Sequence, residues 1–293
     1  MKKIALYLMG FKGLACLQSI IEAGMASNIV VVIGSKDDAI QNDYYADIEL
    51  LCNAANIIFV DRKNSNNIQA EVAIAISWRW IIQLSDTVPL IVFHDSLLPK
   101  YRGFAPLVNY LINGEKKVGV TALFASDEYD KGHIIMQAAI DIEYPITIQK
   151  AINDIATCYT KLMLQLLAMY QQGQPIAATP QNEAAATYSL WLNDADYTIN
   201  WHQPAEAIKR FIDSVGYPYN GAVTTLQQQK VTIVAAEVYE DVVIENRTPG
   251  KVIFIKNNYP IIVCGQGLLK ITNMQSKEGQ QLLPLKNFRS QFI

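Results

Sequence analysis

The sequence predicts an α/β protein in which an N-terminal doubly wound, mostly parallel sheet is followed by a small C-terminal β-rich domain. In the first half of the chain, continuous Val- and Ile-rich runs alternate with helical patterns, which is typical of a parallel sheet covered on both faces. Residues 171–186 are then rich in Gln, Ala and Pro, which is the composition of a linker. Beyond them, short apolar runs separated by Asn, Gly and Pro favour antiparallel strands.

The first predicted strand, 4–9, is an apolar run too short for the hydrophobic segment of a signal peptide or for a membrane span. Alternating strand and helix patterns continue from there to a long apolar-periodic helix. In chain order we expect helix 13–23, strand 28–33, helix 43–55, strands 57–60, 72–77, 90–93, 118–126 and 133–142, and helix 147–170.

The second domain is predicted to start with a capped amphipathic helix at 204–215. The short runs that follow predict a small antiparallel sheet or barrel with strands at 222–226, 230–238, 250–255, 261–264 and 268–274. We therefore expect two domains: residues 1–186, which include the long helix and the linker 171–186, and residues 187–293.

Composition and charge exclude several classes of protein. Apolar residues make up 51% of the chain and charged residues 17%, so an intrinsically disordered chain is excluded. The four Cys are far apart without a CxxC pair and there are only three His, so we expect no metal site and reduced thiols in a cytoplasmic protein. The net charge is −3 and no basic cluster is present, so we expect neither a nucleic-acid nor a membrane partner.

Two residues suggest chemistry at the carboxyl edge of the predicted sheet, where ligands bind in open α/β folds. His94 directly follows the strand 90–93, and Asp130 lies in a turn after the next strand. A histidine beside a carboxylate is the minimal pair for general acid–base catalysis. The spacing alone also fits a structural strand-end histidine and an ordinary Asp-x-Gly turn.

The residues around this pair resemble the signature of the folate-dependent formyltransferases. That signature is carried by SLLPKYRG at 96–103, by the 36-residue interval from His94 to Asp130, and by Asp130-Lys131-Gly132. The resemblance continues through residues 119–137 and through 201–222 of the second domain. It implies a Rossmann-like formyltransferase domain in a family that includes glycinamide ribonucleotide, methionyl-tRNA and nucleotide-sugar N-formyltransferases.

The resemblance implies transfer of a formyl group from N10-formyltetrahydrofolate to an amine. The neutral amine attacks the formyl carbon, and the oxyanion of the tetrahedral intermediate needs stabilisation. His94 is then the general base or the oxyanion partner. Asp130 sets the protonation of His94 and accepts the proton of the amine, directly or through water.

The resemblance also implies binding residues, and it gives no metal ligand. Residues expected at the folate are Trp78, Arg79, Trp80, Ser96, Leu97, Leu98, Asp127, Tyr129 and Gly132. Residues expected at the acceptor are Lys100, Tyr101, Arg102 and Gly103. Apart from the resemblance, Lys12 in the Gly-rich turn after the first strand could reach a phosphate of the acceptor, although such a lysine is more often simply solvated.

One position departs from the family pattern. The family has a catalytic Asn two residues before the His, whereas this chain has Val92, which cannot donate to an oxyanion. Three explanations follow: another donor substitutes, the chain transfers a related group or works slowly, or it binds ligands without catalysis. We favour a substitute donor, with a backbone N–H of residues 94–96, Ser96 and Asn109 as candidates.

The expected acceptor is a nucleotide-linked amino sugar, a dTDP-, GDP- or UDP-linked 3- or 4-amino sugar for surface polysaccharide. GYPYNGA at 216–222 resembles that subgroup, and a homodimer is implied with it. Residues 35–49 carry one Lys and five acidic residues, which suits a tRNA backbone poorly. The alternatives are a methionyl-tRNA formyltransferase and a non-catalytic folate- or nucleotide-binding relative.

Overall fold

The computed structural model describes residues 2–65 and 68–293, which form two compact units. The first unit contains the described residues of 1–107, 116–142 and 150–190, and the second contains 108–115, 143–149 and 191–293. Each unit has its own sheet, so the predicted fold class is confirmed: a mostly parallel sheet with helices, and a smaller β-rich part.

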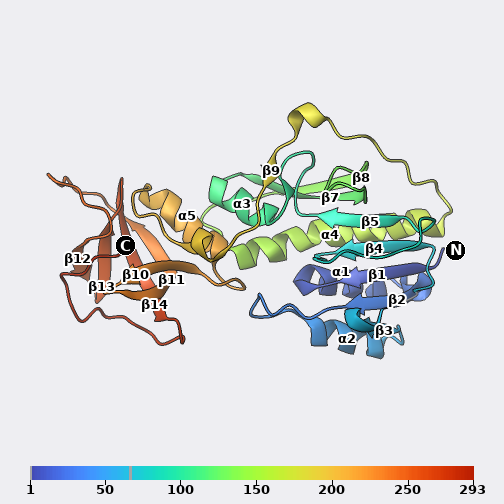
Figure 1. Cartoon of the computed structure of the whole chain (residues 1–293), viewed down its shortest axis with the longest axis horizontal. Helices are drawn as coiled ribbons and strands as arrows, with labels where there is room; N and C mark the ends of the chain where they lie inside the picture. Colours follow the sequence, from blue (N-terminus) through green and yellow to red (C-terminus); the bar gives the residue numbers. More distant parts are fainter. Residues whose placement is uncertain (1, 66–67) are drawn as a thin grey trace. The chain divides into compact units, whose positions relative to one another are not determined.

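The sheet of the first unit has seven strands in the order β3-β2-β1-β4-β5-β7-β8 (Figure 1). The five strands β1 to β5 are parallel, and β7 joins β5 antiparallel and pairs in turn with β8. Their bounds are β1 Ile4–Leu8, β2 Ile29–Gly34, β3 Phe59–Asp61, β4 Val72–Ile76, β5 Leu90–His94, β7 Lys117–Phe124 and β8 Ile134–Asp141.

The two faces of this sheet are covered differently. On one face, Tyr159 of α4 (Ile148–Gln171) stacks on Phe93, and Lys12 of α1 (Gly10–Glu22) lies over the Tyr159 ring. The helix α2 (Tyr45–Ala54) packs against α1. On the opposite face, non-helical residues of the segments 68–70 and 78–88, which flank β4, cover an apolar cluster of β1, β2 and β4. Between β4 and β5, where the sequence predicts no helix, a loop forms this cover.

In the second unit, α5 (Ala205–Val215) packs on a five-stranded antiparallel sheet in the order β10-β11-β14-β13-β12. The strands are β10 Ala222–Leu226, β11 Gln229–Tyr239, β12 Val252–Lys256, β13 Tyr259–Val263 and β14 Leu268–Ser276. Bridges from Phe292 to Leu226 and from Gln291 to Lys251 tie the last residues to both edges of the sheet, which gives it a barrel-like closure. Most of α3 (Pro106–Asn113) also belongs to this unit.

The segment predicted as a linker is attached to the first unit rather than free. The backbones of Thr179 and Ile134 exchange two hydrogen bonds of 2.8 Å. Further along, β9 (Tyr188–Ser189) pairs in parallel with β6 (Arg102–Gly103). None of the described helices combines the length and the apolar character that crossing a membrane needs.

Candidate active site at the carboxyl end of β5

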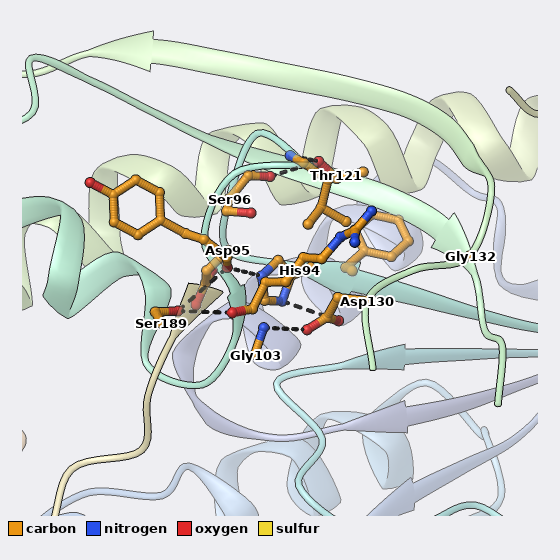
Figure 2. Close-up of polar contacts among 12 residues, drawn as sticks. His94, Asp95, Ser96, Gly103, Thr121, Asp130, Gly132 and Ser189 are labelled. Atoms are coloured by element: carbon orange, nitrogen blue, oxygen red, sulfur yellow. Dashed lines mark hydrogen bonds and ion pairs between the residues drawn. The ribbon is translucent and has the colours of Figure 1, made fainter. Parts of the chain in front are cut away.

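His94 is the last residue of β5 and is buried, and both of its ring nitrogens have partners (Figure 2). Nε2 lies 2.8 Å from the carbonyl oxygen of Tyr101. Because a carbonyl oxygen can only accept, Nε2 carries a proton. Nδ1 faces Oδ1 of Asp130 at 3.4 Å. The two predicted residues are therefore in contact: Nε2 of His94 bonds to the Tyr101 carbonyl, and Nδ1 faces the Asp130 carboxylate.

Asp130 lies in the turn between β7 and β8, with a left-handed φ of 55°. Its Oδ2 accepts a 2.8 Å hydrogen bond from the backbone N–H of Gly103. The turn also depends on Gly132, since a Cβ there would lie 1.7 Å from the carbonyl oxygen of Phe124. Only glycine lets the chain return this close to β7, and this return brings Asp130 to the end of β5.

The loop after His94 is closed by its own hydrogen bonds. Ser96 is fully buried, donates its N–H to the His94 carbonyl at 2.8 Å and donates its hydroxyl to the Lys100 carbonyl at 2.7 Å. The hydroxyl of Thr121 donates to the Ser96 carbonyl and accepts from the N–H of Leu98. This corrects the expectation for Ser96, because its donors hold the loop together and are not available for folate or an oxyanion.

Arg102 is also fully buried, and its five N–H donors are engaged within the chain. They bond to Gln181, Glu183 and Tyr188. The hydrogen bonds from Arg102 lower the pKa of Glu183 below its ordinary value. The structure thus assigns Arg102 to holding the segment 181–188, in place of the predicted contact with the acceptor.

A second polar cluster surrounds Asp95, for whose side chain the sequence predicted no role. Its carboxylate pairs with the ammonium of Lys12 and accepts a 2.7 Å hydrogen bond from the Tyr159 hydroxyl. Burial by itself would raise the pKa of Asp95, but the charge and hydrogen bond of Lys12, together with Tyr159, hold it below its ordinary value. Lys12, predicted to reach a phosphate, is therefore an ion-pair partner in this structure.

Val92 faces apolar surroundings. It shares a face of β5 with His94, because side chains alternate along a strand, and it packs against the cluster that contains Ala73 and Ala75. Asn109, a predicted substitute, lies on α3 in the second unit. Its role stays a prediction.

One backbone donor beside His94 remains open. β4 ends at Ile76, and Ser77 turns into the left-handed region with a φ of 54°, which stops the ladder between β4 and β5. Among the described residues, the backbone N–H of Asp95 has no hydrogen-bond acceptor. Two further polar atoms at this edge, Ser77 Oγ and Trp78 Nε1, are buried without a partner in the described part of the chain.

The other residues predicted at the folate lie at the same edge of the sheet or in the adjoining turns. The rings of Trp78 and Trp80 meet edge to face at 5.4 Å, and Arg79 pairs with Asp37. The Arg62 guanidinium lies 4.3 Å from the centroid of Trp80. A cavity of about 280 Å³ adjoins them, lined by Ser35, Lys36, Asp37, Asp38, Asp61, Arg62, Lys63 and Trp80.

Around the predicted pair itself, side chains range from buried to open. Leu98 is buried and Leu97 half-buried, whereas Asp127 and Lys100 are exposed. The exposed ring of Tyr129, directly before Asp130, lies 5.9 Å from that of Phe104, directly after Gly103. Phe104 was missed by the sequence analysis, although its position next to the motif was a usable signal. No cluster of His, Cys, Asp or Glu suited to a metal ion occurs among the residues that the structure describes.

Comparison with known families identifies the class of protein. Residues 8–167 match the family described as formyl transferase, and residues 192–291 match the formyl transferase C-terminal domain. The first match covers more than half of the chain, and the second covers most of the second unit. The chain belongs to the formyl transferase family, whose members are enzymes that transfer formyl groups.

Individual relatives differ in their acceptors. The chain is 31% identical over 226 residues to a methionyl-tRNA formyltransferase of Syntrophomonas wolfei, covering 76% of this chain and 71% of the relative. WlaRD, a sugar 3N-formyl transferase crystallised with dTDP and 5-N-formyl-THF, matches with a TM-score of 0.69, 20% identity and coverage of 96% and 98%. An N-formyltransferase of Helicobacter canadensis, complexed with folinic acid and dTDP-3-aminofucose, matches with a TM-score of 0.70, 16% identity and coverage of 92% and 99%. At these identities, the two structural matches establish a shared fold.

Proposed function

We propose that this formyltransferase moves the formyl group of N10-formyltetrahydrofolate to the amine of a nucleotide-linked amino sugar. The observation that carries the proposal is the contact between His94 and Asp130 at the carboxyl end of β5. The unpartnered Ser77 Oγ and Trp78 Nε1 at the same edge support a ligand with polar ring atoms, as the pterin of the donor has. The relatives crystallised with formyl-folates share this fold.

In the proposed reaction, the neutral amine attacks the formyl carbon and the carbonyl oxygen becomes an oxyanion. The amine gives up a proton as the new C–N bond forms, and the bond from carbon to N10 then breaks while N10 takes up a proton. The products are a formamide and tetrahydrofolate. The chain therefore has to supply a proton acceptor and an oxyanion donor.

The pair of Asp130 and His94 is the proposed proton acceptor. Nε2 of His94 already donates to the Tyr101 carbonyl, so a free ring N–H does not face outward. The carboxylate of Asp130 and Nδ1 of His94 instead face each other, and a proton received there is shared by both. This arrangement favours the base role over the oxyanion role among the two that the family resemblance implies for His94.

The backbone N–H of Asp95 is the proposed oxyanion donor in place of the missing Asn. It follows His94 directly, and it lacks an acceptor within the described chain because the ladder to β4 stops at Ser77. A fixed backbone N–H costs no reorganisation during the reaction, and such donors are common in oxyanion holes. This choice agrees with Val92, which contributes packing only.

The amino-sugar acceptor is supported by charge and by fold. Residues 35–49 carry one Lys and five acidic residues, so this segment offers little to a polyphosphate backbone. The two sugar N-formyltransferases cover this chain along nearly its whole length and are themselves matched over nearly all of theirs. Association as a homodimer is part of the proposal, by analogy with the family.

The test is a transfer assay. The protein is incubated with N10-formyltetrahydrofolate and a panel of dTDP-, GDP- and UDP-linked 3- and 4-amino sugars, and a mass gain of one formyl group is sought by mass spectrometry. A gain on one sugar is the expected result. Measurable folate binding without product on any acceptor would overturn the enzyme proposal in favour of a non-catalytic relative.

A tRNA acceptor is the second candidate, favoured by the 31% identity to a methionyl-tRNA formyltransferase. Initiator methionyl-tRNA is therefore included in the same assay, together with a competition experiment against the sugar. Formylation of the tRNA, or its competition with the sugar, would replace the proposed acceptor while leaving the chemistry at His94 unchanged.

A further inference from the structure

Gln181, in the segment predicted as a linker, uses every hydrogen-bonding position of its side-chain amide. Its Oε1 accepts from Nε and Nη2 of Arg102 at 3.1 and 2.8 Å. Its Nε2 donates to the backbone carbonyls of Asp130 at 2.6 Å and Gly132 at 2.8 Å. An amide has two acceptor and two donor positions, so the side chain is saturated, and its two ends cannot be exchanged.

These bonds close a ring around the catalytic turn. Arg102 holds Gln181, Gln181 holds the backbone on both sides of Lys131, and the Asp130 carboxylate accepts from the N–H of Gly103, the residue after Arg102. Figure 2 shows two contacts of the Asp130 carboxylate, the hydrogen bond from Gly103 and the contact with His94. The left-handed backbone of Asp130 is thus fixed on its carbonyl side by Gln181 and on its carboxylate side by Gly103.

We propose that Gln181 is a positioning residue for formyl transfer, which sets the Asp130 carboxylate against Nδ1 of His94. This inference rests on the proposed catalytic role of that pair. Without the two bonds from Gln181, the turn 130–132 loses the side-chain donors that hold its carbonyls, and the 3.4 Å approach to His94 is no longer imposed. Of the next two residues, Asn182 accepts from the backbone N–H of Ala184 and Glu183 accepts from Arg102, so neither side chain donates to the turn 130–132.

The chemistry of the site requires glutamine. Glutamate has the same length and can still accept from Arg102, but it has no donor and would set a carboxylate oxygen against two carbonyl oxygens. Asparagine is one methylene shorter and cannot span from Arg102 to both carbonyls. Gln181→Glu therefore removes the donation to the turn and keeps the contact with Arg102.

The kinetic test compares Gln181→Glu with Gln174→Glu, the same change at an exposed position of the same segment. On the amino sugar that the wild-type chain formylates, we expect kcat to fall about 10²-fold for Gln181→Glu, the scale of a 1 Å misplacement. The KM for N10-formyltetrahydrofolate stays near that of Gln174→Glu, whereas the melting temperature is lower, because the Asp130 and Gly132 carbonyls lose their donor. Gln181→Met, uncharged and without a donor, is measured beside it in case the glutamate variant does not fold.

A readout that needs no acceptor separates this inference from the proposed function. The chain has three histidines, so the ring nitrogens of His94 can be assigned in long-range ¹H–¹⁵N spectra by comparison with His94→Ala. We expect the Nδ1 resonance of His94 to move in both Gln181 variants, with His133 and His202 unchanged, and not to move in Gln174→Glu. An unmoved His94 resonance would overturn the inference whatever happens to kcat. A moved resonance in a protein that formylates nothing would support the positioning and overturn only the proposed function.

Discussion

His94 and Asp95 are neighbours in the sequence but belong to two polar clusters that are built on different physics. The His94 cluster is held mainly by backbone groups: the Tyr101 carbonyl, the Gly103 N–H, and the carbonyls that Gln181 binds. The Asp95 cluster is an ion pair with Lys12, backed by the Tyr159 hydroxyl. Backbone contacts fix position without committing charge, whereas the ion pair commits two charges to each other.

This difference suits two tasks. A proton acceptor has to change its charge during the reaction, so partners that are neutral and fixed are an advantage. The Asp95 pair keeps its charge, and it anchors the start of the loop to α1 and α4. We therefore expect substitutions in the His94 cluster to change the rate of formyl transfer, and substitutions in the Asp95 cluster to change the stability of the fold.

The largest effect is expected from the catalytic side. His94→Ala should lower kcat by about 10²–10⁴, the usual contribution of general acid–base catalysis, with little change in folding. Formyl transfer measured by mass spectrometry checks this, and His133→Ala, at an exposed histidine, is the control. Full activity in His94→Ala would refute the proposed site.

A pair of substitutions at Asp95 tests whether its backbone N–H is the oxyanion donor. Asp95→Pro and Asp95→Ala both remove the carboxylate, but only proline removes the N–H. We expect kcat of the proline variant to lie about 10²–10³ below that of the alanine variant, the effect of losing one oxyanion donor. Equal rates in two folded variants would exclude this N–H as the donor.

In the Asp95 cluster, substitutions are expected to change the stability of the fold. Asp95→Ala leaves the ammonium of Lys12 without its partner, and we expect a loss of about 3 kcal/mol, the lower end for buried pairs because the two side chains keep exposures of 13% and 17%. Urea unfolding measures the loss. In the matched control, Lys12→Met in the Asp95→Ala background, part of the stability should return.

The same pair predicts a pH dependence. The pKa of Asp95 lies below its ordinary value of 3.8, so its stabilisation is complete above that pH and is lost as the pH falls through the lowered pKa. The difference in unfolding free energy between the wild type and Asp95→Asn should be constant from about pH 7 to pH 5 and shrink below about pH 3.8. A difference that already shrinks near neutral pH would contradict the assignment to Asp95.

The smallest effect is expected at Val92. An amide placed in its apolar cluster should cost about 1–3 kcal/mol of stability, with Val92→Ala as the control for packing. If the Asp95 N–H is the oxyanion donor, kcat of Val92→Asn should stay at the wild-type level. A clear gain in kcat would show that the missing Asn limits the rate.

Much of the fold follows from local patterns. The apolar runs predict the strands of both sheets to within a few residues. In the first sheet, β1 and β4 are buried on both faces and are therefore apolar throughout. The loop that covers one face between β4 and β5 was not predicted, since its apolar residues have no period. The attachment of residues 171–186 to the first unit was not predicted for a related reason. Polar side chains such as Gln181 have the composition of a linker, and the sequence does not show the distant groups to which they bond.

The family and the fold class could be predicted from the sequence alone, and the pair of His94 and Asp130 is predicted from it, because these inferences depend on residue types at fixed spacings, with SLLPKYRG between the two residues. Only the tertiary structure decided what each of these residues bonds to. In it, Ser96 and Arg102 bond within the chain and Lys12 pairs with Asp95, whereas the Asp95 N–H has no acceptor among the residues that the structure describes. The physical reason is that a hydrogen bond depends on distance and direction between groups far apart in the chain. Arg102 and Gln181 are separated by 79 positions in the sequence, and no local pattern predicts their contact.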